Sequence, residues 1–412
     1  MDRTPIPGDA SAALLVAVLV AACGSDAGDS AWVAEADTVG GIVRVVNTPP
    51  PAGTSPSLVA VEELQIGTVE GGGPMSFGAI RSLAVLPDGR IAVADGQAEE
   101  VRLFARDGQH QRTFGGAGAG PGELDGMQGV HTDHEGMLRV AEQANARLSV
   151  FHPDSGYVAS YPLRLFSFSF RGPWNAVIDS AGRTLVASSG QYGEGRSWNM
   201  LRVYDPAMNQ LDSIPYNEYT GDIEGDVPGA WRIDIGNTGF TWAPVPFYSR
   251  PFQVVAPTAQ FWSSTEGMAE LEVARWAPPA DTSLVLISRR RSDPVTSAER
   301  DSAMAQLREN LMRRVRSLRG LDASQVPATK PPLYGLSLDN HGRLWVRLTE
   351  PIADTTVYDV FGRDGRHAET VQLPYRVDRY VPPVVRGDTV WAVVTDEMDV
   401  QYVVRARLRP PE

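Results

Sequence analysis

Short runs of alternating apolar and polar residues, separated by glycine turns, recur along most of the chain. One such unit runs from Leu83 through the turn glycine Gly89 to Phe104. Equivalent turn glycines follow at Gly136 and Gly182, at steps of 47 and 46 residues. Glycine supplies the positive φ that tight hairpin turns need, and β-branched and aromatic residues fill the runs between the turns. The pattern therefore predicts a repeated unit of several short strands.

Three further copies of the unit follow, a degenerate one over 252–287 and clearer ones over 336–365 and 384–408. Repeats of roughly 40 to 50 residues with several strands each are typical of propeller blades. The fold class is therefore predicted to be all-β, a six-bladed β-propeller over 40–412. Because a propeller exposes strand edges until its ring closes, we expect Val43–Val46 or Val59–Ile66 to add a strand to the last blade.

Residues 294–320 follow a helical period instead. Thr296 and Glu299 form a capping-box pattern, and apolar residues then recur every three or four positions from Met304 to Leu318. These features predict one inserted helix that ends at Gly320. We expect this helix to pack on the rim of the propeller, and a helix that docks a partner or lipid headgroups is the alternative.

A second insertion, 216–252, is rich in aromatic residues and also contains acidic ones. Aromatic faces next to acidic groups can bind sugars, peptides or cations, and long loops on a rigid scaffold often carry recognition. The candidate ligand-binding residues are Trp231, Trp242 and Tyr248. A lid that packs its own aromatic rings on the blade is the alternative.

Near the N-terminus, the stretch from Ser11 to Ala22 contains about twelve apolar or small residues, which are too few to span a bilayer. They predict a signal peptide over 1–22, with an ordinary buried helix as the alternative. The stretch ends in Val-Ala-Ala-Cys, which resembles the bacterial lipobox, so Cys23 is the predicted lipid-attachment site. Residues 23–39 are then expected to form a flexible tether, and Gly24 after the cysteine favours the outer membrane of the cell envelope.

Composition narrows the possible functions. The chain has a net charge of −13 and a pI near 5.0. A negatively charged protein surface repels the phosphates of nucleic acid, so no DNA or RNA partner is expected. Cys23 is the single cysteine, which excludes an intramolecular disulfide. The single lysine, Lys330, follows no glycine-rich run, so the chain has no phosphate-binding loop, and no Gly-x-Ser-x-Gly elbow presents a nucleophile.

His131 and Asp133 lie close together just before a blade turn. Imidazole and carboxylate groups can bind a metal, which makes these two residues candidate ligands for calcium or zinc. The alternative is that they are surface turn residues. Asp179 and Asp339 occupy the equivalent position before the turn in two other repeats. Aspartate at such a position commonly stabilises the turn itself.

Gly115–Leu124 reads Gly-Gly-Ala-Gly-Ala-Gly-Pro-Gly-Glu-Leu and joins the first two repeats. With the Asp-Gly turns and the Val-Arg-Leu-Phe strand, it resembles six-bladed propellers of the NHL-repeat and TolB-like type, in particular their bacterial lipoproteins. Most of these have no assigned activity, so the resemblance implies a non-enzymatic binding or scaffolding lipoprotein with a protein partner or a small ligand. Two alternatives remain open: an axial-metal-dependent lyase or lactonase, as in related propellers, and a lipoprotein that captures carbohydrate or peptide.

Overall fold

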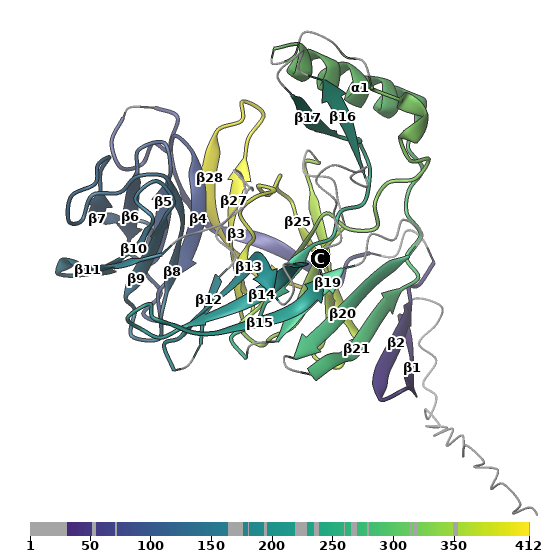
Figure 1. Cartoon of the computed structure of the whole chain (residues 1–412), viewed down its shortest axis with the longest axis horizontal. Helices are drawn as coiled ribbons and strands as arrows, with labels where there is room; N and C mark the ends of the chain where they lie inside the picture. The colour runs from purple at the N-terminus through teal and green to yellow at the C-terminus, as the bar shows by residue number, and fades with distance from the viewer. Residues whose placement is uncertain are drawn as a thin grey trace, which may run out of the picture.

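The computed structural model describes residues 31–51, 55–70, 72–163, 176–179, 181–192, 196–218, 229–234, 239–258, 260–264, 270–277, 280–313, 315, 318, 320–348 and 353–411. Six four-stranded antiparallel units are arranged in a ring, which confirms the all-β propeller (Figure 1). The predicted signal peptide and Cys23 lie outside the described residues. Among the described residues, no helix is long and apolar enough to cross a membrane.

The first three blades follow the repeat that the turn glycines predict. Blade one contains β4 (Ile80–Val85), β5 (Ile91–Asp95), β6 (Glu100–Phe104) and β7 (His110–Gly115). Blade two contains β8 (Met127–Thr132), β9 (Leu138–Glu142), β10 (Arg147–His152) and β11 (Gly156–Pro162). Blade three contains β12 (Ala176–Ile178), β13 (Thr184–Tyr192), β14 (Arg196–Tyr204) and β15 (Gln210–Glu218).

The other three blades include the degenerate fourth copy, which forms four regular strands. Blade four contains β18 (Gln253–Val255), β19 (Phe261–Ser264), β20 (Leu271–Ala277) and β21 (Ala280–Ser288). Blade five contains β22 (Gly335–Leu338), β23 (Leu344–Arg347), β24 (Thr356–Phe361) and β25 (His367–Leu373). Blade six contains β26 (Val384–Arg386), β27 (Thr389–Thr395), β28 (Gln401–Arg409) and, as its fourth strand, β3 (Leu58–Ile66).

β3 closes the ring, as one of the two predicted closing segments. It pairs antiparallel with β28 from Val403↔Ile66 to Arg409↔Val59. It also touches the outer strand of blade five, where Val371 pairs with Leu58 in parallel. The N-terminal strand thereby covers the edge that the last blade would otherwise expose.

Residues 33–39, which the sequence assigns to the flexible tether, instead form strand β1 (Val33–Val39), so this part of the tether prediction is wrong. β1 pairs with β2 (Ile42–Thr48), and β2 adds in parallel to β21 of blade four. Gly40 and Gly41 connect the two strands with φ of +60° and +85°, the backbone that a two-residue hairpin turn requires. The alternation on both sides of Gly40-Gly41 was the available signal for this hairpin.

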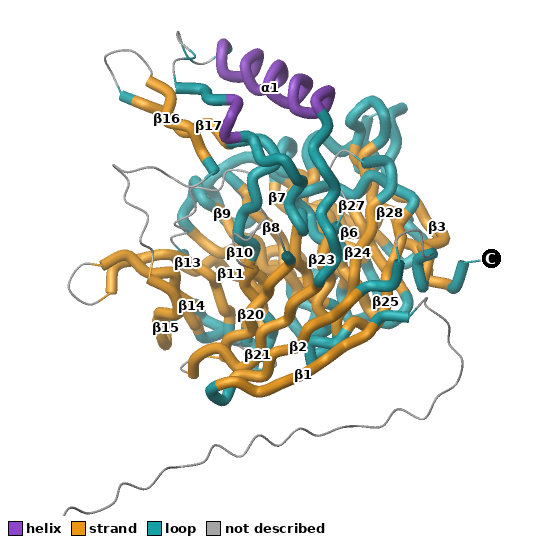
Figure 2. Tube along the Cα trace, turned by 90° about the vertical axis from the view of Figure 1, so that its right-hand side faces the viewer, coloured by secondary structure: helices purple, strands orange, loops and turns teal. Residues whose placement is uncertain are grey.

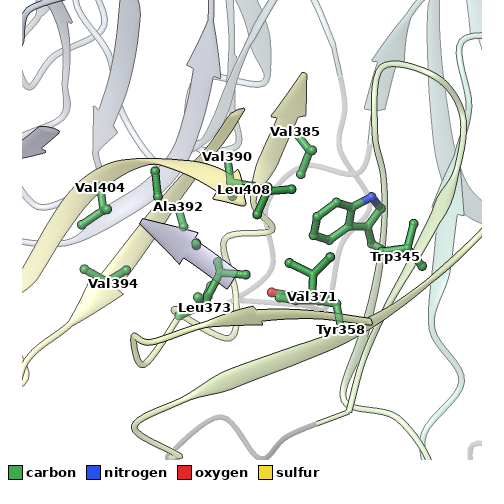
Figure 3. Packing of buried hydrophobic residues seen from close by; sticks show 14 residues of the cluster. Trp345, Tyr358, Val371, Leu373, Val385, Val390, Ala392, Val394, Val404 and Leu408 are labelled. Carbon is green, nitrogen blue, oxygen red and sulfur yellow. The ribbon is translucent and has the colours of Figure 1, made fainter. Parts of the chain in front are cut away.

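Apolar side chains of neighbouring blades meet face to face and form the core. Between blades five and six, Trp345 and Tyr358 pack against Val390, Val404 and other residues of β27 and β28 (Figure 3). The rings of Trp345 and Tyr358 lie 5.5 Å apart, edge to face. Each fully buried large apolar side chain contributes about 1.5–3 kcal/mol, so these seams hold the blades together.

Candidate functional site

The two insertions predicted from the sequence meet above the ring and form one small unit, here called the cap. The first contributes the hairpin β16 (Ala230–Asp234) and β17 (Phe240–Pro244), and the second contributes α1 (Ser297–Met312). A 3₁₀ turn at Ala323–Gln325 follows the second insertion. The hairpin precedes blade four and α1 follows it, so the cap joins segments on both sides of that blade (Figure 1). The cap is the largest departure from the plain propeller among the described residues.

The start of α1 is fixed by the capping box that the sequence predicts. The Glu299 amide donates to Thr296 Oγ1 at 3.2 Å, and the Thr296 amide donates to Glu299 Oε2 at 2.9 Å. Lys330, between the 3₁₀ turn and β22, donates to Glu299 Oε1 at 2.6 Å. The hydrogen bonds from Lys330 and Thr296 lower the pKa of Glu299 to about 2, so this carboxylate stays charged and links the first turn of α1 to the segment before blade five.

One face of the hairpin packs on α1 and gives the cap its own hydrophobic core. The core comprises Trp231, Ile233, Ala243, Val245, Met304, Leu311, Val315 and Val326, with Phe247, Tyr248 and Leu307 partly buried against it. The helix therefore packs on the hairpin, and not on the rim of the propeller as the sequence suggested. The helix was located correctly, but α1 ends at Met312 and not at Gly320, so Val315 and Leu318 of the predicted stripe lie beyond its end. Its partner, the hairpin, lies more than 50 residues earlier in the chain.

The other face of the hairpin carries a different set of side chains, here called the aromatic face: Arg232, Asp234, Phe240 and Trp242. In the strand register Arg232 lies opposite Trp242, and Asp234 lies opposite Phe240. The Phe240 and Trp242 rings meet edge to face at 5.5 Å, and the Arg232 guanidinium lies 4.1 Å from the centroid of the Phe240 ring. The arrangement holds two aromatic rings and a cation in fixed positions.

The aromatic face remains accessible. Arg232 and Asp234 are exposed, and Phe240 and Trp242 are half-buried. In Figures 1 and 2 the hairpin lies nearer to the blades than α1 does, so the face opposite α1 is turned toward the propeller. The aromatic face can therefore offer stacking surfaces, a hydrogen-bond donor and an acceptor to one ligand.

The structure separates the three predicted ligand-binding residues. Trp231 is only 3% exposed and lies in the cap core, so its ring is not available to a ligand at the surface. Tyr248 packs on Gly229, where a Cβ would collide with the ring, and lies partly buried against the cap core, apart from the aromatic face. Trp242 alone reaches the aromatic face. Arg232 and Phe240 are not among the predicted ligand-binding residues, although strict alternation along both strands would have placed them beside Trp242.

Asp133 is a turn former, and the structure does not support it as a metal ligand. Its Oδ1 accepts hydrogen bonds from the Glu135 and Met137 amides at 3.1 and 2.9 Å, and its Oδ2 accepts from Arg139 at 3.2 Å. Its carboxylate is thus engaged, while His131 lies at the end of β8. Within the described ranges, no three His, Cys, Asp or Glu side chains come close enough to hold a metal ion.

The same turn geometry recurs in blades three and five. Oδ1 of Asp179 and of Asp339 accepts the amides two and four residues further on at 2.8–2.9 Å, and Oδ2 accepts from Arg183 and Arg343, respectively. The aspartates in equivalent positions are therefore structural, which confirms the turn-forming alternative.

No protein-family model matches the sequence, and no curated protein matches it. Solved structures with a similar chain path include a member of the DUF4221 family from Bacteroides vulgatus, with a TM-score of 0.47 and 9% identity over 86% of this chain and 99% of that one. A streptogramin B lyase has a TM-score of 0.41 and 11% identity, covering 84% of this chain and 97% of that one. A gluconolactonase from Xanthomonas campestris has a TM-score of 0.39 and 10% identity, covering 80% and 86%. This similarity is too low to transfer a function to the chain.

Proposed function

We propose that the protein is a non-enzymatic binding protein of the bacterial cell envelope and that the aromatic face of the cap is its recognition surface. One observation carries the proposal. Two insertions from either side of blade four build a separate core whose packing leaves Arg232, Phe240 and Trp242 together on an accessible face. A plain structural lid would have no need of a second aromatic face.

The chemistry of the aromatic face suits a saccharide or a short peptide. Aromatic rings stack on the apolar faces of sugars and side chains, while Arg232 supplies donors and Asp234 supplies acceptors. Rigid strands hold these groups in position, which lowers the entropic cost of binding. The resemblance to NHL-repeat and TolB-like lipoproteins, which implies a binding or scaffolding role, supports the same proposal.

The test is a screen of residues 24–412 against an array of bacterial envelope saccharides and short peptides. The expected result is a ligand whose affinity falls at least about tenfold in Trp242→Ala and in Arg232→Ala, since such contacts are typical binding hot spots. Tyr157→Ala serves as the control, because Tyr157 is a 39% exposed aromatic residue on β11, outside the cap. A ligand that binds both cap variants with unchanged affinity would show that the binding site is not the aromatic face. Chemical conversion of a bound ligand would contradict the non-enzymatic role.

We also propose that Cys23 anchors the protein to a membrane, most simply the outer membrane, through covalently attached lipid. The lipobox-like Val-Ala-Ala-Cys stretch and the short apolar segment before it support this proposal. Two or three acyl chains suffice for stable anchoring, whereas one gives only reversible binding. Cys23→Ala should therefore move the protein from the membrane fraction to the soluble fraction of the producing bacterium, with no change in its melting temperature. A Cys23→Ala protein that stays in the membrane fraction would contradict lipid anchoring.

A further inference from the structure

We propose that the free edge of β1 is a docking site for an extended, basic segment of a partner protein, which would add to blade four as a seventh strand. β1 is the outermost strand of a six-stranded sheet in the order β1-β2-β21-β20-β19-β18. Six of its seven residues are exposed, including Val33 and Val39 at 57% and 62%. This site is independent of the proposed function, because β1 and the cap lie at opposite ends of the molecule (Figures 1 and 2).

The outer strands of blades one to three carry features that discourage pairing with another chain. The register between β6 and β7, between β10 and β11 and between β14 and β15 is in each case interrupted by a bulge or irregularity. β11 also ends at Pro162, and β15 contains Pro215. Bulges and prolines are the usual means by which natural sheets block their edges.

β1 has none of these features. Its register with β2 runs unbroken from Val33↔Thr48 to Val39↔Ile42, and its sequence, Val-Ala-Glu-Ala-Asp-Thr-Val, contains neither proline nor glycine. The outer strands of blades five and six, β25 and β3, touch each other instead. On the outer edge of β1, the Ala34 carbonyl accepts from Arg366 Nη1 at 3.1 Å, so a partner strand would pair with β1 beyond this residue. Among the described outer strands of the propeller, β1 is the one with an unbroken register and an edge without bulge or proline.

Charge indicates what pairs with β1. Glu35 and Asp37 lie two residues apart and so point to the same face of the strand as Val33 and Val39. A symmetric antiparallel pair of two β1 strands centred on Glu35, Ala36 or Asp37 would always place one acidic side chain opposite another. Like charges directly opposite each other are destabilising, which disfavours a second copy of this chain. In a partner strand with two basic residues between two apolar ones, the basic side chains would lie opposite Glu35 and Asp37. The apolar side chains would lie opposite Val33 and Val39.

The probe is the fluorescently labelled peptide Ac-Val-Thr-Arg-Thr-Lys-Thr-Val-NH2, titrated with residues 24–412, a chain that keeps every described residue. In the variant Glu35→Lys/Asp37→Lys the affinity should fall at least about tenfold, since two favourable cross-strand pairs become repulsive. The control Glu70→Lys/Glu397→Lys makes the same change in net charge at exposed residues outside the strands. It should lower the affinity by less than about threefold.

Two peptides that are N-methylated at alternate residues distinguish strand pairing from simple charge attraction. They keep the charge of the probe, but each loses the backbone donors along one of its edges. One of the two should lose binding and the other should retain it, because a paired strand uses only one edge. Equal binding of both methylated peptides, equal loss in the two lysine variants, or no binding of the probe at millimolar concentration would overturn the proposal.

Discussion

A chain that begins at Gly67 is expected not to fold into a stable propeller. It lacks β3, which forms seven register pairs with β28 and buries Ala60 and Ile66 at 3% and 0% exposure. At about 0.5–1.5 kcal/mol for each backbone hydrogen bond, with the lost apolar packing added, the cost is at least about 5 kcal/mol. That is comparable to the total stability of a typical domain, about 5–15 kcal/mol. Thermal unfolding followed by circular dichroism would show no cooperative transition.

A chain that begins at Ser57 is the matched control. It lacks the β1–β2 hairpin but keeps β3, so the ring can still close. We expect a cooperative transition at a lower temperature than in the longer protein, because blade four loses the β2–β21 ladder and the buried Asn47. If the chain from Gly67 melted as cooperatively as the chain from Ser57, ring closure by β3 would not be the stabilising feature that the topology implies.

Asp359→Ala is expected to destabilise the protein by about 1–3 kcal/mol, because it removes a buried acceptor and leaves the donors that it satisfied without it. Asp359 is fully buried in blade five and accepts from Arg290 Nε and Nη2 at 2.8 and 2.9 Å, and from Thr370 at 2.7 Å. His367 lies 3.5 Å from the same carboxylate. Trp32, from the N-terminal segment, stacks on His367 at 3.8 Å. The carboxylate thus organises the contact between the N-terminal hairpin and blade five.

The same carboxylate should make stability depend on pH. Burial by itself raises the pKa of Asp359, but the hydrogen bond from His367 and the charge of Arg290 lower it below its ordinary value of 3.8. A carboxyl group with a lowered pKa contributes stability above its ordinary pKa and loses that contribution as the pH falls through the lowered value. Urea unfolding should therefore show stability falling below about pH 4 in the natural protein, with a smaller fall in Asp359→Ala.

Asp364→Ala is the control for this prediction. Asp364 lies nearby in the turn before β25 and forms an exposed ion pair with Arg366 at 3.7 Å. Exposed pairs contribute about 0–1 kcal/mol, so this variant should unfold almost as the natural protein does. Equal stabilities of Asp359→Ala and Asp364→Ala at pH 7 would contradict the assigned role of the buried carboxylate.

The repeated elements could be predicted from the sequence because their signals are local. A turn glycine with positive φ, such as Gly89, Gly136 or Gly182, and the alternation next to it are readable within a single unit. The inserted helix was predicted in the same way, from Thr296, Glu299 and a periodic stripe. The hairpin at Gly40-Gly41 carried an equally local signal, but the sequence analysis assigned these residues to the tether expected after Cys23.

The candidate site could be predicted only in part. The aromatic-rich insertion was located correctly, but its residues could not be divided between core and surface until the partner of the hairpin was known. Trp231 and Trp242 are equally plausible as ligand-binding residues in the sequence. Alternation along β16 and β17 separates them into two faces, and the position of α1 decides which face is buried.

The sequence by itself determined the all-β class, six repeats and one helix, because each depends on residues close together in the chain. It offered two segments for the closing strand, and only the structure decided that β3 closes the ring. Only the tertiary structure decided that α1 packs on the β16–β17 hairpin and that β2 extends blade four. The physical reason is that these contacts join segments up to about 240 residues apart, as Asn47 does with Ile287. The apolar or polar pattern of such a segment is compatible with packing against many other segments of the chain. Only the closed ring determines which of them lies next to it.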